Sequence, residues 1–363
     1  MRITLGPLIL TLLTVSAQAG LVGEDDEALI QLLFAEAAAA HAQAHDADAM
    51  AVIGQDGFLF LSRELRHLSA GPFWGEHAQE AGQAPRPDQR DPLPVILDHH
   101  RQLSEQGIKL ILVPVPPKAV VYPDKLSPRL ATSITAAQEK TATIPRLDIH
   151  HQAFYAILDE HGVQVLDLVP LFLAARQDLD DDRHLYCRQD SHWSGRAMEI
   201  TARALADMIG PADWFPEPRE TFSSASRTIQ IRGDLLQALE EQDALQAARE
   251  QVSLTVVNDG AAAIADRASP IVMLGDSHLL VFHIGGNMHA TGAGLGDLLA
   301  ARLGFPLDVV GVRGSGVTAA RVNVIRQSFR DPEYLPNKRV MVWLFAAREF
   351  TEASSWAILP LTR

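Results

Sequence analysis

The stretch IVMLGDSH, residues 271–278, passes from four apolar residues directly into Gly275, Asp276 and Ser277. A short apolar run that ends at a glycine is typical of a strand buried in a parallel sheet. A serine placed after such a strand lies at the carboxyl edge of the sheet, where open α/β folds bind ligands and carry nucleophiles. We therefore predict a buried strand over residues 271–274 and a sharp turn that exposes Ser277.

Apolar runs of similar length alternate with helical patterns along most of the chain. Buried strands separated by helices are typical of a mainly parallel sheet with helices on both faces, so the predicted fold class is α/β. The predicted strands cover residues 109–115, 163–167, 252–257, 271–274, 307–310 and 339–345. The predicted helices cover residues 94–105, 146–161, 168–176, 194–208, 234–250 and 297–303, with a further helix that ends at 328.

Four segments fall outside this alternation. Residues 24–50 have helical spacing and predict an amphipathic helix that packs outside the sheet. Residues 51–61 predict a hairpin, because Asp-Gly at 56–57 is a turn signal next to apolar runs. Residues 71–94, rich in Gly, Pro and charge, predict a loop, and the prolines within 210–226 predict an irregular connector.

The N-terminus has the pattern of a secretory signal. A charge at Arg2 precedes an apolar core over residues 5–15 and the small residues Ala17-Gln18-Ala19. The apolar core is short for a full membrane span, although an uncleaved anchor is the alternative. We expect an exported chain with a signal peptide over 1–19, an N-terminal helix over 20–50 and one catalytic domain over 51–363.

Charge and cysteine content exclude several classes of protein. The formal net charge of −14 argues against a nucleic-acid partner, and an acidic polysaccharide would need basic contacts local to a groove. Cys187 is the only cysteine among 363 residues, which excludes an intramolecular disulfide and a cysteine-rich metal site. The adjacent histidine pairs at 99–100 and 150–151 are expected at the surface. We expect neither a metal nor a cofactor.

Three residues have the chemistry of a serine acyl-transfer site. Serine is a weak nucleophile unless a base removes its proton, and a histidine base needs a carboxylate to fix its tautomer. Asp190 and His192 are two positions apart, so both side chains can share one face of an extended segment. We predict Ser277 as nucleophile, His192 as base and Asp190 as the orienting acid. The alternative is that Ser277 and Asp190 cap helices and His192 is an ordinary loop histidine.

Other candidate residues rest on position alone. The backbone N–H of Ser277 is a natural donor to an oxyanion, and the loop over 311–316, beginning at Gly311, is the candidate for a second donor. Arg313 in that loop can aid a substrate carboxylate or an acyl oxygen. Trp193 either packs against the loop that carries Asp190 and His192, which we favour, or stacks against a sugar ring. Ser194 is expected to cap the helix that follows it.

These motifs, taken in order, resemble the SGNH-hydrolase-like family of bacterial polysaccharide O-acetyltransferases, the alginate acetylation proteins of the AlgJ and AlgX type. In this family Asp and His precede Ser, the reverse of ordinary SGNH esterases. Phe58, where tryptophan is usual, and His278 depart from the pattern. The resembling segments are IGQDGFLFL at 53–61, VPVPPK at 113–118, YPDKL at 122–126, DSHWS at 190–194, GDS at 275–277 and VWLFAAREF at 342–350.

The resemblance implies a three-layer SGNH-hydrolase-like (flavodoxin-like) fold and a periplasmic enzyme. It implies that Ser277 is acetylated, that His192 moves the proton, and that an exopolysaccharide such as alginate accepts the acetyl group. It also implies that Arg348, after the closing strand, belongs to the site. The implied partners are a membrane-bound O-acyltransferase that supplies acetyl, and other exopolysaccharide acetylation or export proteins.

Two alternatives remain open from the sequence. A carbohydrate acetylesterase of SGNH type would use the same acyl-enzyme, because only the final acceptor, water or a sugar hydroxyl, differs. A non-catalytic polysaccharide-binding or scaffold subunit of an export complex would also be acidic and carry a long N-terminal helix. The chain ends at Arg363, which leaves no room for the carbohydrate-binding module of the AlgX type and favours the AlgJ type.

Overall fold

The computed structural model describes residues 24–361 except 218, 242–244, 262–265 and 315. The predicted signal peptide over 1–19 lies outside the described residues, as does Ser315 of the candidate oxyanion loop.

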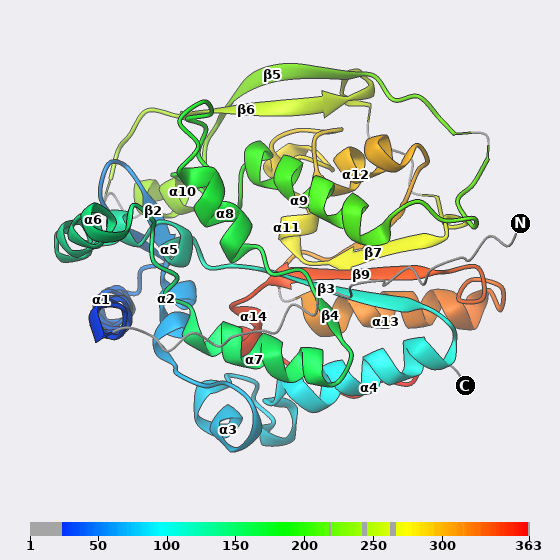
Figure 1. The fold of residues 1–363 in the computed structure, drawn as a ribbon, viewed down its shortest axis with the longest axis horizontal. Helices are drawn as coiled ribbons and strands as arrows, with labels where there is room; N and C mark the ends of the chain where they lie inside the picture. The colour runs from blue at the N-terminus through cyan, green and yellow to red at the C-terminus, as the bar shows by residue number, and fades with distance from the viewer. Residues whose placement is uncertain (1–23, 218, 242–244, 262–265, 315, 362–363) are drawn as a thin grey trace, which may run out of the picture.

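Five parallel strands form the central sheet, which confirms the α/β fold class (Figure 1). All neighbouring strands in this sheet pair in parallel. The strands lie in the order β4 (Gln164–Val165), β3 (Lys109–Val115), β9 (Val340–Ala346), β7 (Ile271–Gly275) and β8 (Asp308–Gly311).

The strand order explains why Asp190 and His192 precede Ser277 in the chain. Counted from β7, the serine strand, through β8 and β9 and on to β3 and β4, the order across the sheet reads 2-1-3-4-5. That is the flavodoxin-like order. The chain enters this arrangement at the fourth strand, β3, instead of the first. The loop after the fifth strand therefore comes before the serine strand in the sequence.

Alternate residues of the strands face two separate cores. Ile111, Met273 and Val342 belong to the core with α9 (Gly195–Ile209) and α12 (Leu295–Leu303). Leu112 and Trp343 belong to the opposite core. The helices of that core are α4 (Pro92–Glu105), α7 (Ile149–Glu160) and α13 (Gly316–Arg330). Figure 1 shows the two helical layers above and below the sheet.

One predicted strand does not belong to the parallel sheet. Residues 252–257 fall in β6 (Glu250–Val257), which pairs antiparallel with β5 (Ser224–Ile231) in a ribbon at the top of Figure 1. Most residues of β5 are exposed, so the ribbon has one face toward solvent. The expectation of an irregular connector over 210–226 is wrong at its end, because β5 begins at Ser224.

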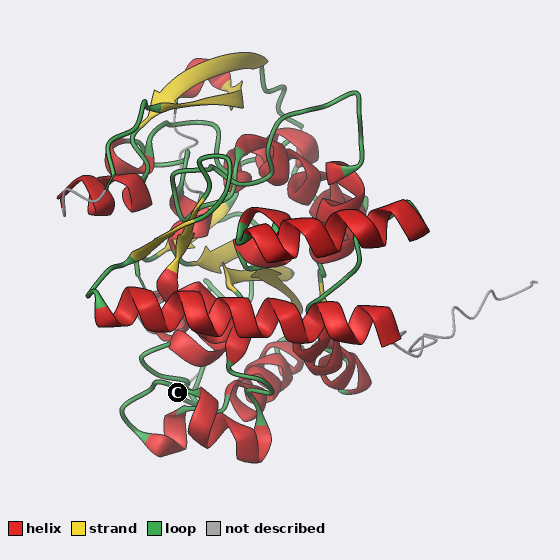
Figure 2. Ribbon diagram, turned by 90° about the vertical axis from the view of Figure 1, so that its left-hand side faces the viewer, coloured by secondary structure: helices red, strands yellow, loops and turns green. Residues whose placement is uncertain are grey.

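The N-terminal region packs against one side of this core. The predicted helix is α1 (Glu24–Asp46), which contacts α2 (Ser62–Ser69) and α6 (Pro128–Thr141), and Figure 2 shows it along the outside of the molecule. The predicted hairpin is formed by β1 (Ala51–Ile53) and β2 (Leu59–Leu61). No helix in the described part of the chain is both long and apolar enough to span a membrane.

Several further elements were absent from the prediction or differ from it. Helix α6 was not predicted, and the expected loop over 71–94 contains α3 (Ala78–Ala81) and two single 3-10 turns. The helix predicted over 234–250 is shorter, because α10 covers Asp234–Glu241. The remaining helices are α5 (Lys118–Val121), α8 (Val169–Arg176), α11 (Ser277–Leu280) and α14 (Glu349–Glu352).

The expectation that the paired histidines lie at the surface is wrong for two of them. His99 is buried edge-on against Trp343, with ring centroids 5.2 Å apart. His151 is buried with its Nε2 2.8 Å from the Nε2 of His67. Burial lowers the pKa of His151 to about 3 and holds the pKa of His67 well below its usual value, which favours the neutral form of both rings.

Candidate active site

Ser277 is placed by a tight turn at the end of β7. Gly275 has no room for a side chain, because a Cβ there would lie 2.4 Å from the carbonyl oxygen of Leu344. Asp276 then fixes the turn with both carboxylate oxygens, which accept hydrogen bonds from the backbone N–H groups of His278 and Ala346 (2.8 Å each). Asp276 therefore caps α11, and the Ser277 hydroxyl is left to point at the sheet edge.

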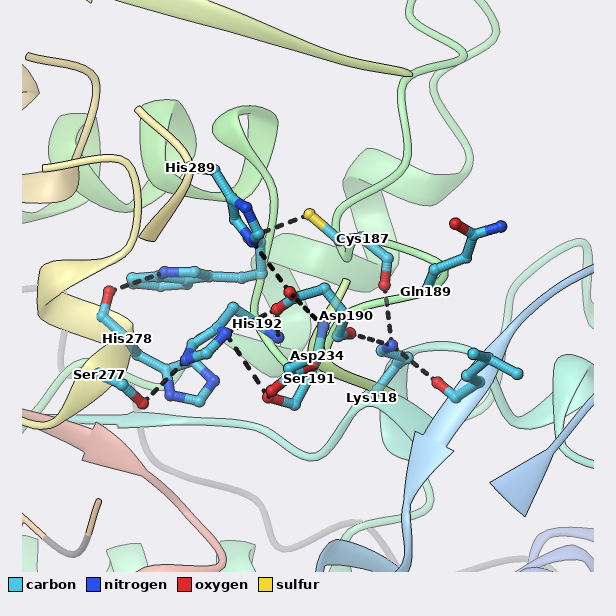
Figure 3. A network of polar contacts seen from close by, with 12 residues as sticks. Lys118, Cys187, Gln189, Asp190, Ser191, His192, Asp234, Ser277, His278 and His289 are labelled. Atoms are coloured by element: carbon cyan, nitrogen blue, oxygen red, sulfur yellow. Dashed lines mark hydrogen bonds and ion pairs between the residues drawn. The ribbon is translucent and has the colours of Figure 1, made fainter. Parts of the chain in front are cut away.

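The structure brings the three predicted residues together. The Nε2 of His192 is 2.8 Å from the Oγ of Ser277, and the Nδ1 of His192 is 2.6 Å from Oδ1 of Asp190 (Figure 3). With the proton on Nδ1 donated to the carboxylate, Nε2 accepts the hydrogen bond of the serine hydroxyl. This is the arrangement that general-base activation of a serine requires.

Electrostatics favour an ionised Asp190 beside a basic His192. Burial raises the pKa of Asp190, but attraction to His192 and His289 outweighs it and holds that pKa well below its usual range. Burial lowers the pKa of His192, but the Asp190 carboxylate outweighs it and raises that pKa above the ordinary histidine value. The pair can therefore hold a proton on His192 when one is taken from serine.

A buried lysine holds the loop that carries Asp190 and His192. The Nζ of Lys118 donates to the carbonyl oxygens of Leu59 (2.8 Å), Cys187 (2.8 Å) and Asp190 (2.6 Å). Burial lowers the pKa of Lys118, and nearby Glu64 partly offsets that effect. The lysine thus connects the loop that carries Asp190 and His192 to β2. Lys118 ends the segment VPVPPK, which resembles the family, but the sequence alone assigned this residue no role.

Two residues that the sequence did not single out complete the surroundings of Asp190. Its Oδ2 accepts hydrogen bonds from the backbone N–H of Asp234 and from Nε2 of His289 (3.0 Å each). His289 adopts φ 72°, a conformation that is rare for a residue with a side chain and that persists only where its surroundings hold it. The carboxylate of Asp234 in turn accepts from the N–H (2.7 Å) and hydroxyl (2.5 Å) of Ser191.

Ser277, His192 and Asp190 line one cavity of about 630 Å³. Arg313 and Arg348, both predicted site residues, line the same cavity. Arg348 is largely buried, with its Nη1 3.6 Å from Oε1 of Glu64. Arg63 and Arg232 add two further cationic side chains to the lining.

Two other predicted contacts are not at this cavity. Trp193 is fully buried, and its Nε1 donates to the carbonyl oxygen of His278 (3.0 Å), so it packs beneath the site loop, as the favoured interpretation expected. Gly311 packs against Leu280 on the far side of the turn, where a Cβ would lie 2.2 Å from Leu280 Cδ2. Neither Trp193 nor Gly311 is in the lining of the Ser277 cavity.

Ser194 takes the N-cap position of α9 but does not cap it with its side chain. Its hydroxyl donates to the carbonyl oxygen of His184 instead (2.5 Å). That bond fastens the end of the site loop to the segment before it.

Among the described residues, the side chains of Asp190, His192 and Asp234 are close enough to share a metal ion. Their ligand atoms already have hydrogen-bond partners. Asp190 and His192 bind each other, and Asp234 accepts both bonds from Ser191. The geometry fits a hydrogen-bonded acyl-transfer site.

Comparisons with known proteins identify the family of this chain. The model of the family described as "SGNH hydrolase-like domain, acetyltransferase AlgX" matches residues 51–286. The chain is 26% identical over 185 residues to a probable alginate O-acetylase AlgJ of Pseudomonas syringae, covering 51% of this chain and 40% of that protein. It is 25% identical over 196 residues to the Pseudomonas aeruginosa protein of the same description, covering 54% and 42%. The chain thus matches less than half the length of these two relatives.

Two solved structures share the fold. The O-acetyltransferase domain of Pseudomonas putida AlgJ superposes with a TM-score of 0.54 at 18% identity, covering 83% of this chain and 92% of that one. Pseudomonas aeruginosa AlgX superposes with a TM-score of 0.58 at 17% identity, covering 86% and 66%. Since the family model spans more than half of the sequence, this chain belongs to the SGNH hydrolase-like family of the acetyltransferase AlgX.

Proposed function

We propose that this chain is an O-acetyltransferase that moves acetyl groups onto hydroxyls of an exopolysaccharide through an acetyl-serine intermediate. The observation that carries the proposal is the Ser277–His192–Asp190 chain of hydrogen bonds at 2.8 and 2.6 Å, open to a cavity large enough for a sugar. The relatives described as alginate O-acetylases support the choice of acetyl and of a polysaccharide acceptor. We further propose that the chain acts in the periplasm and takes its acetyl from a membrane-bound O-acyltransferase.

The first half-reaction loads the enzyme. His192 takes the Ser277 proton at Nε2 while Oγ attacks the donor's acetyl carbonyl, and negative charge develops on the carbonyl oxygen. The backbone N–H of Ser277 would donate a hydrogen bond to that oxygen and stabilise the charge. His192 then returns the proton to the departing donor group, which leaves acetyl on Oγ.

The second half-reaction unloads it. His192 takes the proton of an acceptor hydroxyl, the sugar oxygen attacks the acetyl carbon, and Ser277 regains its proton as the ester bond to it breaks. The arginines of the cavity, Arg313 and Arg348 among them, would orient carboxylates of an acidic acceptor. A water molecule in place of the sugar would give an acetylesterase.

The test is to trap the acetyl-enzyme. After incubation with p-nitrophenyl acetate and rapid acid quench, mass spectrometry of the digested chain should find one acetyl group, on the peptide with Ser277. Addition of alginate before the quench should remove that label and transfer it to the polymer. The heat-unfolded chain is the control and should stay unlabelled at Ser277. Release of free acetate at the same rate with and without polymer would make the chain an esterase.

The pH dependence of acetylation follows from the raised pKa of His192. His192 must be neutral to accept the serine proton, so activity is lost as the pH falls through the pKa of His192. Because that pKa is raised, the loss begins at a higher pH than for an ordinary histidine. We expect the acidic limb of kcat/KM for p-nitrophenyl acetate to lie above about 6.5, the ordinary histidine pKa. NMR titration of the imidazole should place His192 there. In Asp190→Asn, where burial acts without the carboxylate, the titration should move to lower pH, and an unchanged midpoint would contradict the assignment.

A further inference from the structure

Strand β8 forms an open edge of the parallel sheet, next to the serine strand. It pairs only with β7 among the described strands, and its residues 309–311 are half-buried. The N–H of Val312 bonds to the carbonyl of Gly275. Because a parallel ladder uses every second residue, the main-chain groups of Val309 and Gly311 point away from β7. The edge therefore offers free hydrogen-bonding groups to a ligand.

A groove of about 390 Å³ runs between this edge and α13. Asn323, Arg326, Gln327 and Arg330 line it at positions i, i+3, i+4 and i+7, so they share one face of the helix. Arg267, from the segment before β7, also lines the groove, next to Gln327.

The groove concentrates positive charge on a chain of net charge −14. Arg267, Arg326 and Arg330 are exposed, and across the described residues none of the three is in an ion pair. The side-chain oxygen of Gln327, oriented to suit its neighbours, accepts two hydrogen bonds from Arg267 at 3.1 Å, which positions that guanidinium without neutralising it. The carboxylate in the lining, Asp308, is bound by Lys338 (2.8 Å) and the hydroxyl of Tyr334 (2.7 Å).

The groove leads toward the Ser277 cavity. Gly311 lines the groove, and Arg313, two residues later, lines the cavity. Helix α13 starts at Gly316 beside Asp276, where a Cβ would lie 2.8 Å from Asp276 Cα, and runs away from the site for 15 residues. At about 1.5 Å per residue, Arg330 at the far end of this helix is roughly 20 Å from Gly316. That length suits several sugar units of one chain.

We propose that this edge groove, lined by Arg267, Arg326 and Arg330, binds carboxylates of the acidic acceptor polysaccharide several units away from the sugar that is acetylated. The inference rests on the proposed function, since it assumes that the acceptor reaches Ser277. Arginine binds carboxylates through paired N–H groups, and several weak contacts along one polymer add to its retention. The alternative ligand with complementary charge is an extended acidic protein segment that pairs with β8. The continuity with the cavity favours the polysaccharide.

The experiment compares polymer with small acceptor in the full chain. The variant Arg267→Ala/Arg326→Ala/Arg330→Ala should bind polymeric alginate about tenfold more weakly or worse, equivalent to roughly 1.4 kcal/mol. Its KM for the polymer should rise accordingly, while kcat, transfer to an alginate disaccharide and acetylation by p-nitrophenyl acetate stay unchanged. Raising the salt concentration should weaken wild-type binding more than that of the variant.

Arg203→Ala, which removes an exposed arginine on α9, is the matched control and should bind alginate like the wild type. The single variant Arg326→Glu, checked by its melting temperature, tests the groove if the triple variant unfolds. Unchanged alginate binding by the folded variants would overturn the inference, and loss of binding to an oligoglutamate peptide alone would assign the groove to a protein segment. If the wild-type chain transferred no acetyl but the groove variants still bound alginate more weakly, the proposed function would be rejected and the groove would remain a polysaccharide-binding site.

Discussion

The Ser277→Ala protein is expected to lose acetyl transfer by about ten-thousand-fold or more, because it lacks the hydroxyl that we propose holds the acetyl between donor and acceptor. Its residual rate should reflect binding and oxyanion stabilisation alone. The loss should appear in two measurements, the release of p-nitrophenol from the donor ester and the acetyl content of the polymer. Acetylation of the Ser277 peptide should disappear in the same protein.

The same substitution should barely change stability. Ser277 is at a sheet edge, and among the described side chains its hydroxyl bonds only to His192, so we expect a change in unfolding free energy within about 1 kcal/mol. Ser191→Ala is the matched control, since this second serine lines the same cavity but donates its hydroxyl to Asp234. It should keep the acetyl label on Ser277. A Ser277→Ala protein that still acetylates polymer, or a label found on Ser191, would contradict the assignment.

The central sheet could be predicted because its strands are buried on both faces. β3, β7 and β9 are almost entirely apolar and buried, with no regular alternation of polar residues. β6 is only half apolar, and its sequence alternates Val252, Leu254 and Val256 with Ser253 and Thr255. That alternation is typical of a strand with one wet face and was the available signal that it lies outside the parallel sheet. Its mostly exposed partner β5 gave a weak signal, because Ile229 and Ile231 at its end are its only large apolar residues.

The site could be predicted where its chemistry is local in sequence. Asp190 and His192 are two residues apart, and Ser277 follows a recognisable strand. His289 could not be found in this way, because it comes from a loop 99 residues after Asp190 and meets it only through the fold. The role of Lys118 also depends on tertiary structure, since the carbonyls it binds come from segments 59 to 72 residues away.

The helix caps show why short polar motifs mislead when read singly. Ser194 and Ser277 both stand where a cap was plausible. In the fold, Ser194 bonds to a carbonyl of the preceding segment and Asp276 caps α11. Which neighbour satisfies a helix terminus depends on the chain packed beside it, and the sequence shows only the candidates.

The second large effect is expected from Asp190, and its signature is non-additivity. Asp190→Asn keeps the side-chain shape but removes the charge that stabilises the protonated His192 and fixes its tautomer. We expect a loss of about ten-thousand-fold in kcat for acetyl transfer. His192→Ala should lose at least as much. The double variant should lose no more kcat than the worse single variant. Either single change already leaves Ser277 without an effective base, so the second change has nothing further to remove.

His289 supplies the graded comparison for Asp190. It donates one of two hydrogen bonds to Oδ2 of Asp190, and the backbone N–H of Asp234 donates the other. His289→Leu therefore removes one of these hydrogen bonds and keeps the Asp190 carboxylate. Its loss in kcat should be near tenfold, the scale of about 1.4 kcal/mol, and far below that of Asp190→Asn. His289→Gln keeps an N–H donor and should recover most of it. If the Asp190 and His192 losses multiplied, or if His289→Leu were as damaging as Asp190→Asn, the three side chains would not act as one unit around the Ser277 hydroxyl.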